Sequence, residues 1–327
     1  MQQPDIVTLQ KDMSFEGFVL VRSSEQRVGS NGSRYLDMTL CDKTGEINAK
    51  LWDGAYAPPK TGSVVKVRAT VQEFKGHMQL RIDRMRALAE SDDIDIASLT
   101  PCAPEKPEDM LAEITQTVDS LENADMKSIV RVMLAHCGDK LIYWPAASKM
   151  HHAIRSGLLY HTVTMLRAAK AIAGVYKELD RDLLYSGVII HDLAKISEMD
   201  SDEMGGVSEY TVEGQLLGHL VKGVSDVRAA AEEANVTGEI PLLLEHMVIS
   251  HHGTAEFGSP RLPMFMEADV LHWLDILDAH MYQFSAAVSA TRPGGFSDKV
   301  WSLDRRVYRP AYGEEQAEMQ PDDDGLL

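Results

Sequence analysis

The sequence predicts two structural domains, a small all-β barrel followed by an all-α helical bundle. Short segments with alternating apolar and polar residues are confined to residues 15–84, whereas longer apolar segments with helical spacing dominate after Pro107. Charge divides in the same way. Residues 1–90 contain 13 Lys and Arg against 11 Asp and Glu, a net charge of +2, and the remaining residues carry −20 of the total of −18. We therefore expect two domains with different partners, of which the first is able to approach a polyanion.

Five segments in the first domain have the alternation and the β-branched and aromatic content of strands. They are Phe15–Arg22, Arg34–Cys41, Glu46–Trp52, Ser63–Glu73 and Met78–Arg84. Turns rich in Gly, Pro and Asn separate them, and YLDMTLCDKTGEINAKLWD reads as a central hairpin. Five short strands in a segment of this length are typical of an OB-fold barrel, which we expect to occupy residues 1–88.

Residues 89–107 combine acidic residues with three prolines and have no sustained period, which predicts a linker. A helix is expected to begin at Pro107, because proline and acids favour a first helical turn. Helical segments then continue almost to the end of the chain, and we assign the second domain to residues 108–293. Residues 294–327 form a C-terminal extension that ends in an acidic tail, residues 313–327.

The composition excludes several classes of protein. No apolar run approaches the ~20 residues that span a bilayer, and the N-terminal segment lacks the basic start and apolar core of a signal peptide. Three cysteines are too few and too scattered for a disulfide framework or a zinc knuckle. We expect a cytoplasmic protein.

The histidines of the helical domain form an ordered series with two acids. Eleven of the twelve histidines follow residue 130. The candidates, each in an apolar stretch expected to be helical, are His161, His191, Asp192, His219, His251, His252 and Asp275. An unpaired polar group in such a stretch is costly to bury. Imidazoles and carboxylates on facing helices are how bundles build binuclear metal sites, so the series predicts a metal centre.

The other histidines have an ordinary structural explanation. We expect His77, His136 and His280 to be hydrogen-bonded core or surface residues, because a single histidine is more often structural than a ligand. The roles of His246 and His272 stay open. His246 lies about a turn and a half before His251, so it could pack near the metal centre without being a ligand.

The order of this series is that of the ligands of the HD superfamily of metal-dependent phosphohydrolases. More specifically, the chain resembles the YhaM-type 3′-to-5′ exoribonucleases, which join an N-terminal OB domain to a C-terminal HD domain. Four segments carry the resemblance: HHAIRSGLLYHTVTM (151–165), HDLAKISEM (191–199), EYTVEGQLLGHLVKG (209–223) and ISHHGTAEFGSPRLPMFMEADVLHWLDILDAHM (249–281). The resemblance covers residues 13–290. It implies a hydrolase that degrades single-stranded RNA to nucleoside 5′-monophosphates.

The resemblance also implies a role for each site residue. It implies metal ligands at His161, His191, Asp192, His219, His251 and Asp275. Asp192 would be the bridging carboxylate and His252 would lie next to the substrate phosphate. Lys195, one turn after His191, would stabilise charge on the phosphoryl oxygens. Two ions would lower the pKa of a bridging water. The resemblance favours Mn²⁺, although the ligand types also suit Fe²⁺, Co²⁺ or Zn²⁺.

The barrel is the expected binding surface for the strand, because OB-folds bind single strands through basic grooves and aromatic platforms. Candidates for base stacking are Phe18, Tyr35, Trp52 and Phe74. Candidates for phosphate contacts are Arg34, Lys43, Lys50, Lys66 and Arg81. About half of such aromatic residues are normally core, because alternate strand residues face inward. A net charge of +2 is modest, so we expect weak and salt-sensitive binding.

Several alternatives stay open at this point. The same metal site would serve an HD phosphohydrolase acting on small nucleotides, and the same ligand series supports di-iron oxygenase chemistry. A different class is an OB-fold single-strand-binding protein with a non-catalytic helical domain, against which the complete ligand set argues. The sequence does not distinguish RNA from single-stranded DNA as the substrate, since that specificity depends on contacts to the ribose 2′-OH. A homo-oligomer is also left open.

Overall fold

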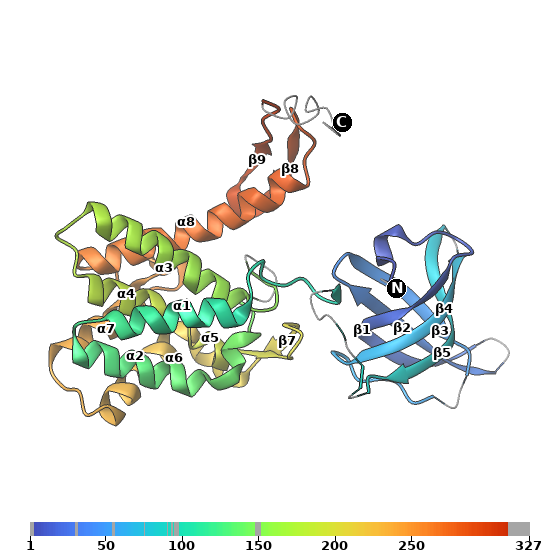
Figure 1. The fold of residues 1–327 in the computed structure, drawn as a ribbon, viewed down its shortest axis with the longest axis horizontal. Helices are drawn as coiled ribbons and strands as arrows, with labels where there is room; N and C mark the ends of the chain where they lie inside the picture. The colour runs from blue at the N-terminus through green and yellow to red at the C-terminus, as the bar shows by residue number, and fades with distance from the viewer. Residues whose placement is uncertain are drawn as a thin grey trace, which may run out of the picture.

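The computed structural model describes residues 3–29, 32–53, 56–74, 76–89, 91–92, 94, 98–147 and 152–312. The expected acidic tail, residues 313–327, lies outside the described residues. The described chain forms an N-terminal barrel and a C-terminal helical body (Figure 1). No helix among the described residues is long and apolar enough to cross a membrane.

The five predicted strands are confirmed, and they close into a barrel in the order β1-β2-β3-β5-β4. Their bounds are β1 Ser14–Val28, β2 Arg34–Asp42, β3 Gly45–Leu51, β4 Val64–Phe74 and β5 His77–Ala87. The expected central hairpin is β2–β3, and the parallel pair β3–β5 completes the barrel. Alternate residues such as Leu36, Met38 and Leu40 are buried, so the outer faces are left for polar and aromatic side chains.

Strand β1 is longer than the sequence predicted, because it continues to Val28 instead of ending at Arg22. Its first half pairs with β4 and its second half with β2. A register shift between Val21 and Ser23 accompanies the change of partner. A bulge of this kind bends a strand, which lets one strand serve two sides of a small barrel.

The segment between the two domains is held at both ends. Leu99 is fully buried against Leu20, Cys41 and Val64 of the barrel. Further along, Cys102 forms an isolated β-bridge with Arg155 of the helical domain.

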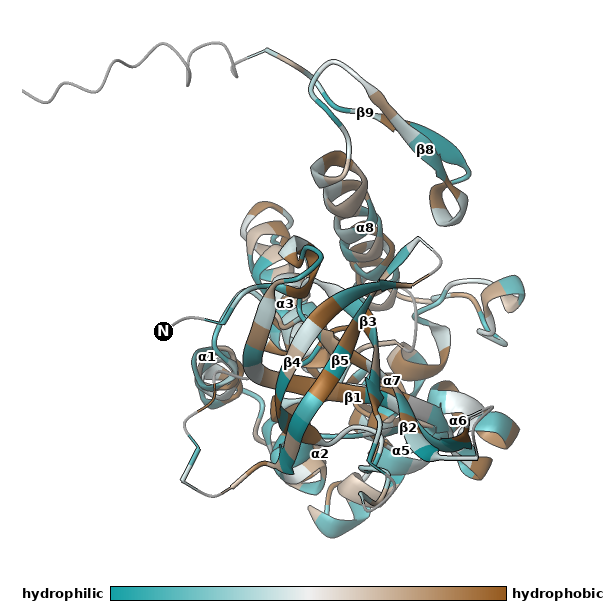
Figure 2. Ribbon diagram, turned by 90° about the vertical axis from the view of Figure 1, so that its right-hand side faces the viewer, coloured by the Kyte–Doolittle hydropathy of each residue, from teal (hydrophilic) through white to brown (hydrophobic). Residues whose placement is uncertain are grey.

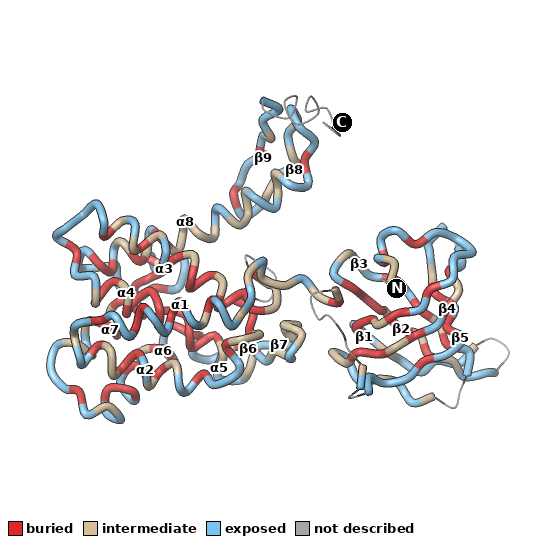
Figure 3. The backbone as a smooth tube through the Cα atoms, viewed as in Figure 1, coloured by how far each residue is buried: buried red, intermediate tan, exposed pale blue. Residues whose placement is uncertain are grey.

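In the described part of the chain, eight helices form the helical body, and α4 packs against α1, α2, α3, α7 and α8. The helices are α1 Pro107–Ser120, α2 Ala124–Cys137, α3 Gly157–Val175, α4 Arg181–Ile190, α5 Lys195–Glu198, α6 Val212–Glu233, α7 Glu239–Ser250 and α8 Met266–Ser289. Short 3₁₀ helices lie at η1 Ile6–Thr8, η3 Gly138–Ile142, η4 Ala255–Phe257 and η5 Trp301–Leu303. Buried residues are concentrated where these helices face one another (Figure 3).

Two hairpins interrupt what the sequence predicted as helical almost to the end. The first pairs β6 Met199–Ser201 with β7 Val207–Tyr210, and the second pairs β8 Phe296–Val300 with β9 Arg305–Tyr308. Apolar residues that were expected to be helical, such as Met199 and Val307, here lie in short strands and are buried. The second half of α8 extends away from the bundle and carries the β8–β9 hairpin at its end (Figures 1 and 2).

Candidate metal centre

The six predicted metal ligands converge at the centre of the helical body from five different helices or helix ends. They are His161 on α3, His191 and Asp192 after α4, His219 in α6, His251 after α7 and Asp275 on α8. The sequence placed every one of them inside a helix. That expectation is wrong for three of them, since α4 ends at Ile190 and α7 at Ser250.

Asp192 lies between two groups of histidine nitrogens. Its Oδ2 is 3.6 Å from His161 Nε2 and 3.5 Å from His191 Nε2. Asp275 Oδ1 lies 3.4 Å from the same His161 nitrogen. Donor atoms about 3.4 Å apart match a tetrahedral ion with bonds of about 2.1 Å. This group of donors therefore fits one metal position.

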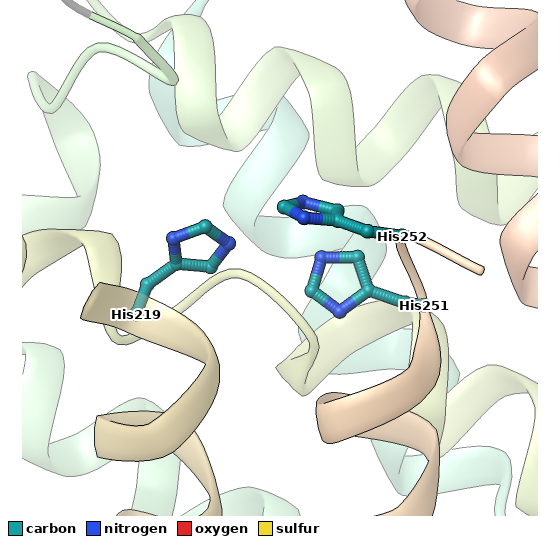
Figure 4. A group of neighbouring side chains, drawn as sticks. All are labelled: His219, His251 and His252. Carbon is teal, nitrogen blue, oxygen red and sulfur yellow. The ribbon is translucent and has the colours of Figure 1, made fainter. Parts of the chain in front are cut away.

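The other carboxylate oxygen of Asp192 faces a second group. Its Oδ1 lies 3.5 Å from His219 Nε2 and 3.6 Å from His251 Nε2. These three atoms are buried and have no hydrogen-bond partner among the residues that the structure describes. Buried polar atoms without partners are rare in folded proteins, so three in one place fit a bound cation. Figure 4 shows the imidazoles of His219 and His251 approaching each other, with His252 beside them.

The four histidines predicted as metal ligands each use Nδ1 to donate a hydrogen bond to a fixed oxygen. The Nδ1 of His191 donates to the Val188 carbonyl and that of His251 to the Val248 carbonyl, each at 2.8 Å. Each acceptor lies in the last turn of the preceding helix, where carbonyls lack helical partners. A proton on Nδ1 leaves the lone pair of Nε2 directed at Asp192, as metal ligation requires.

A break in α6 positions His219. Gly218 has φ of 68° and ψ of 166° inside the helix, a backbone conformation that favours glycine. The break frees the backbone N–H of His219, and Glu198 Oε1 accepts both this N–H and His219 Nδ1 at 3.0 Å each. One carboxylate oxygen therefore fixes the backbone and the ring of His219 together.

Asp278 orients the ring of His161, as Glu198 orients that of His219. Its Oδ2 accepts hydrogen bonds from His161 Nδ1 and from His152 Nε2, both at 2.7 Å. Its Oδ1 accepts a hydrogen bond from Thr164 Oγ1 at 2.6 Å. Carboxylates placed behind metal-ligating histidines orient the ring and raise its basicity.

The electrostatics of the centre favour ionised carboxylates and positive charge between them. Burial alone would lower the pKa of His161, but Asp275 and Asp278 outweigh it and raise that pKa to about 10. Burial lowers the pKa of His251 to about 3 and also lowers that of His191. Burial opposes ionisation of Asp192, yet Lys195 and His191 hold its pKa well below the ordinary range.

Lys195 and His252 border the centre. Lys195 Nζ lies 2.6 Å from Asp192 Oδ2, and its side chain is nearly buried rather than facing solvent. The Nδ1 of His252 donates to the Phe257 carbonyl at 2.8 Å, and its ring centroid lies 5.1 Å from that of His219. The nitrogens of His252, His219 and His251 lie within 4.8 Å of one another, so His252 is close enough to share the second metal position.

A cavity of about 500 Å³ opens from this centre and runs along α8. His219, His252 and Asp275 lie in its wall, together with Lys195. Small side chains at Ala146, Ala147 and Ala279 leave room inside it, and further along it is lined by Gln283 of α8 and Ser302 of η5. Pockets of this volume accept ligands of nucleotide size.

On the barrel, five of the predicted residues form one cluster. Tyr35 and Trp52 stack with ring centroids 4.4 Å apart and planes 26° apart. Lys50 Nζ lies 5.4 Å from the Tyr35 ring centroid and 5.5 Å from that of Phe74. Arg81 lies opposite Lys50 in the β3–β5 register. Trp52 and Phe74 are both more than half exposed, so this outer face offers stacking surfaces beside positive charge.

The remaining barrel candidates lie apart from this cluster or at its margin. Phe18 is on the β1–β4 side, with Lys66 Nζ 5.3 Å from its ring centroid. Lys43 is in the β2–β3 turn, and its backbone N–H donates to Ser98 O. Arg34 begins β2 next to Tyr35 and is exposed.

Three residues that orient the candidate ligands were not predicted from the sequence: His152, Glu198 and Asp278. Two signals were present. Glu198 lies in the segment HDLAKISEM, and Asp278 follows Asp275 by one helical turn. His272 was left open; its Nδ1 donates to the His251 carbonyl at 2.8 Å. His246 accepts a hydrogen bond from the Met264 N–H, which is a structural role.

Comparisons with known proteins agree with this architecture. The family model of the HD domain matches residues 158–280, and that of the OB-fold nucleic acid binding domain matches residues 14–88. The 3′-5′ exoribonuclease YhaM of Geobacillus sp. (strain WCH70) is 41% identical over 303 residues, which cover 90% of this chain and 91% of the relative.

Among solved structures, the second OB-fold domain of replication protein A from Methanococcus maripaludis is 18% identical. It covers 28% of this chain and 98% of its own, with a TM-score of 0.23. The mitochondrial single-stranded DNA binding protein Rim1 of S. cerevisiae is 16% identical, covers 24% and 93% of the two chains, and has a TM-score of 0.19. From its identity and coverage against the Geobacillus relative, the chain belongs to the YhaM family of proteins with an OB-fold and an HD domain.

Proposed function

We propose that this chain is a metal-dependent 3′-to-5′ exoribonuclease that shortens single-stranded RNA and releases nucleoside 5′-monophosphates. One observation carries the proposal. The two carboxylate oxygens of Asp192 face separate pairs of histidine Nε2 atoms, within 3.5–3.6 Å, as a carboxylate shared by two cations would. The 41% identity to an enzyme named as a 3′-5′ exoribonuclease supports the substrate.

The HD domain implies a divalent metal, and the donors described above fit it. We propose two ions, with Mn²⁺ favoured over Fe²⁺, Co²⁺ and Zn²⁺, since mixed imidazole and carboxylate donors suit all four. When bound, the ions polarise phosphoryl oxygens and lower the pKa of water. His161, His191, Asp192 and Asp275 would hold one ion; His219, His251 and the other oxygen of Asp192 would hold the second.

The neighbouring side chains have defined tasks in the hydrolysis. Asp192 raises the pKa of the nearly buried Lys195, although burial opposes this, so the ammonium is available to a phosphoryl oxygen. His252 lines the cavity, where burial lowers its pKa and keeps the ring neutral as a hydrogen-bonding group near the phosphate. Water adds to phosphorus and the P–O3′ bond breaks. The 3′-oxygen of the shortened strand takes up a proton, and the phosphate leaves on the released nucleoside.

The barrel would hold the strand while its 3′ end is cut. Tyr35, Trp52 and Phe74 offer ring faces for bases, and Lys50 and Arg81 offer charge for phosphates. Phe18 and Lys43 are weaker candidates because they lie away from this cluster. Arg34 is a weaker candidate because it lies at the margin of the cluster, next to Tyr35. Single-stranded DNA as a second substrate, assembly into a homo-oligomer and a cytoplasmic location stay predictions.

We propose the domain division expected from the sequence: an OB-fold domain at residues 1–88, a linker at 89–107, an HD domain at 108–293 and a C-terminal extension at 294–327. The barrel strands and both family matches fall inside these limits. The start of α1 at Pro107 supports the end of the linker.

Purified protein incubated with 5′-labelled single-stranded RNA and Mn²⁺, with a chelator control, tests the proposal. A metal-dependent ladder that shortens from the 3′ end is expected. Absence of cleavage with every divalent metal tried would refute it and favour a hydrolase of small nucleotides. RNA binding without hydrolysis of either substrate would favour a single-strand-binding protein whose helical domain is not catalytic.

A further inference from the structure

The C-terminal β8–β9 hairpin differs in charge from the domain that carries it. Residues 91–290 contain 14 Lys and Arg against 31 Asp and Glu, a net charge of −17. Residues 291–312 contain five Lys and Arg against two Asp, a net charge of +3. A local positive segment on an acidic domain is suited to a polyanion that the rest of the domain repels.

Exposed aromatic side chains lie among these positive charges. The exposed fractions are 59% for Phe296, 82% for Trp301, 48% for Tyr308 and 89% for Tyr312. Among the described residues of the hairpin, only Thr291, Leu303 and Val307 are buried. Figure 3 shows the hairpin mainly exposed at the end of α8. These aromatic rings therefore do not form a core, and their exposed surfaces are accessible to a partner.

Each end of the hairpin combines a ring with a cation. Lys299 Nζ lies 4.7 Å from the Trp301 ring centroid, and the Arg306 guanidinium lies 5.3 Å from that of Phe296. Phe296 and Tyr308 lie with centroids 5.0 Å apart. Lys299 Nζ forms an ion pair with Asp304 Oδ1 in the hairpin. Among the described residues, the side chains of Arg305 and Arg306 donate to backbone carbonyls and form no ion pair with a carboxylate.

The hairpin also reaches the catalytic cavity. Ser302, next to Trp301, lines the same cavity as His219 and Asp275. Gln283 lines it as well, eight residues after Asp275 and therefore about 12 Å further along α8. The Oε1 atom of Gln283 is buried and has no hydrogen-bond partner in the described structure, so that part of the cavity offers an acceptor to an incoming hydroxyl or amine.

From these observations we infer that the β8–β9 hairpin is a second binding surface for single-stranded RNA, which guides the strand along α8 into the catalytic cavity. Interleaved cations and exposed ring faces are how proteins hold single strands without sequence preference. The ribose 2′-OH supplies the donor that Gln283 lacks. The inference rests on the proposed RNA substrate but adds a surface remote from the barrel.

The test uses the full-length protein and two hairpin variants. Trp301→Ala removes a ring that is 82% exposed. The double change Arg305→Gln and Arg306→Gln removes two charges. Tyr176→Ala is the matched control, because Tyr176 is a 59% exposed aromatic at the end of α3. Affinity for a 20-nucleotide single-stranded RNA is measured by fluorescence anisotropy in chelator at several salt concentrations, and hydrolysis of that RNA and of a dinucleotide is measured with Mn²⁺.

We expect Trp301→Ala to weaken binding of the 20-nucleotide RNA about 5- to 150-fold, the effect of one lost stacking contact. The arginine variant should reduce the magnitude of the slope of log affinity against log salt by about 1.4. Dinucleotide hydrolysis should change less than twofold, and Tyr176→Ala should match the wild type in every assay.

Affinity for the long RNA within twofold of wild type in both hairpin variants would overturn the inference. So would equal losses on the long RNA and the dinucleotide, because the hairpin would then act only through the fold. The hairpin could instead bind a second copy of this chain, so the oligomeric state of the wild type and of each variant is measured by sedimentation. Hairpin variants that dissociate an oligomer but bind RNA as tightly as the wild type would refute the proposed RNA surface. If the wild type binds RNA but does not cleave it, the proposed function fails while the binding test still decides about the hairpin.

Discussion

Replacing Asp278 by Asn tests whether the carboxylate behind His161 sets the affinity of the metal centre. Asp278 accepts three hydrogen bonds, from His161, His152 and Thr164, at 2.6–2.7 Å. Asparagine has nearly the same shape but no charge, and one of its two terminal atoms is a donor. At least one of the three hydrogen bonds is therefore lost, and those that persist are weaker because the acceptor is neutral.

Two independent magnitudes agree on the size of the effect. A hydrogen bond to a charged group contributes about 1.5–3 kcal/mol. Loss of a carboxylate behind a metal-ligating histidine typically lowers metal affinity about 10- to 100-fold, which corresponds to about 1.4–2.8 kcal/mol. We therefore expect Asp278→Asn to weaken Mn²⁺ binding about 10- to 100-fold.

Titration calorimetry of the full-length protein with Mn²⁺ measures this, together with hydrolysis rates over a range of Mn²⁺ concentrations. Hydrolysis should recover to within a few-fold of wild type when Mn²⁺ is in large excess. Asp269→Asn is the control, since Asp269 is an exposed acid on the same helix. Glu198→Gln should weaken the other metal position in the same way, through His219. Wild-type Mn²⁺ affinity in Asp278→Asn, or a loss of activity that excess metal does not restore, would refute the reasoning.

Three further outcomes are expected. Asp192→Ala should abolish RNA hydrolysis while RNA affinity in chelator stays within about twofold of wild type, because the barrel surface is untouched; residual metal-dependent turnover would count against the shared-carboxylate site. Trp52→Ala should lower RNA affinity about 5- to 150-fold in an anisotropy titration, the range for one stacked base, and an unchanged affinity would move the binding surface elsewhere. Burial raises the pKa of the Cys41 thiol to about 11 and that of Cys137 to about 12, so at pH 8 both should react with iodoacetamide far more slowly than the less buried Cys102. Peptide mass spectrometry resolves the three sites, and equal labelling would contradict the burial.

The barrel could be predicted well because the residue patterns that specify its strands and turns are local in the sequence. Alternation along each strand selects the buried residues, and the turn in the β2–β3 hairpin sets its register. The division of β1 between two partner strands was missed, because a register shift at Val21 and Ser23 leaves no mark in the alternation itself. The two short hairpins after Pro107 were missed for a related reason, since three- to five-residue strands are too short for a period to be recognised.

The six candidate ligands could be predicted from the sequence, but the residues that orient them could not. Asp278 and His161 are separated by 117 positions, and their hydrogen bond depends on how α8 packs against α3. Glu198 meets His219 only because α6 breaks at Gly218. Nothing in the spacing of these residues predicts such contacts, because they arise from tertiary packing.

His191 and His251 show which part of the ligand geometry is local. Both follow the last turn of a helix, and the sequences before them, Val188-Ile-Ile-His191 and Val248-Ile-Ser-His251, begin with the valine whose carbonyl accepts the Nδ1 hydrogen bond. A carbonyl in the last turn of a helix lacks a helical partner, so a histidine three residues later satisfies it and points Nε2 away from the helix. In the helix interior the same carbonyl would already be occupied. This explains why these two ligands lie after helix ends rather than within helices, as the sequence analysis had expected, and it makes a valine-to-histidine spacing of three at the end of an apolar helix a usable signal for a preoriented ligand.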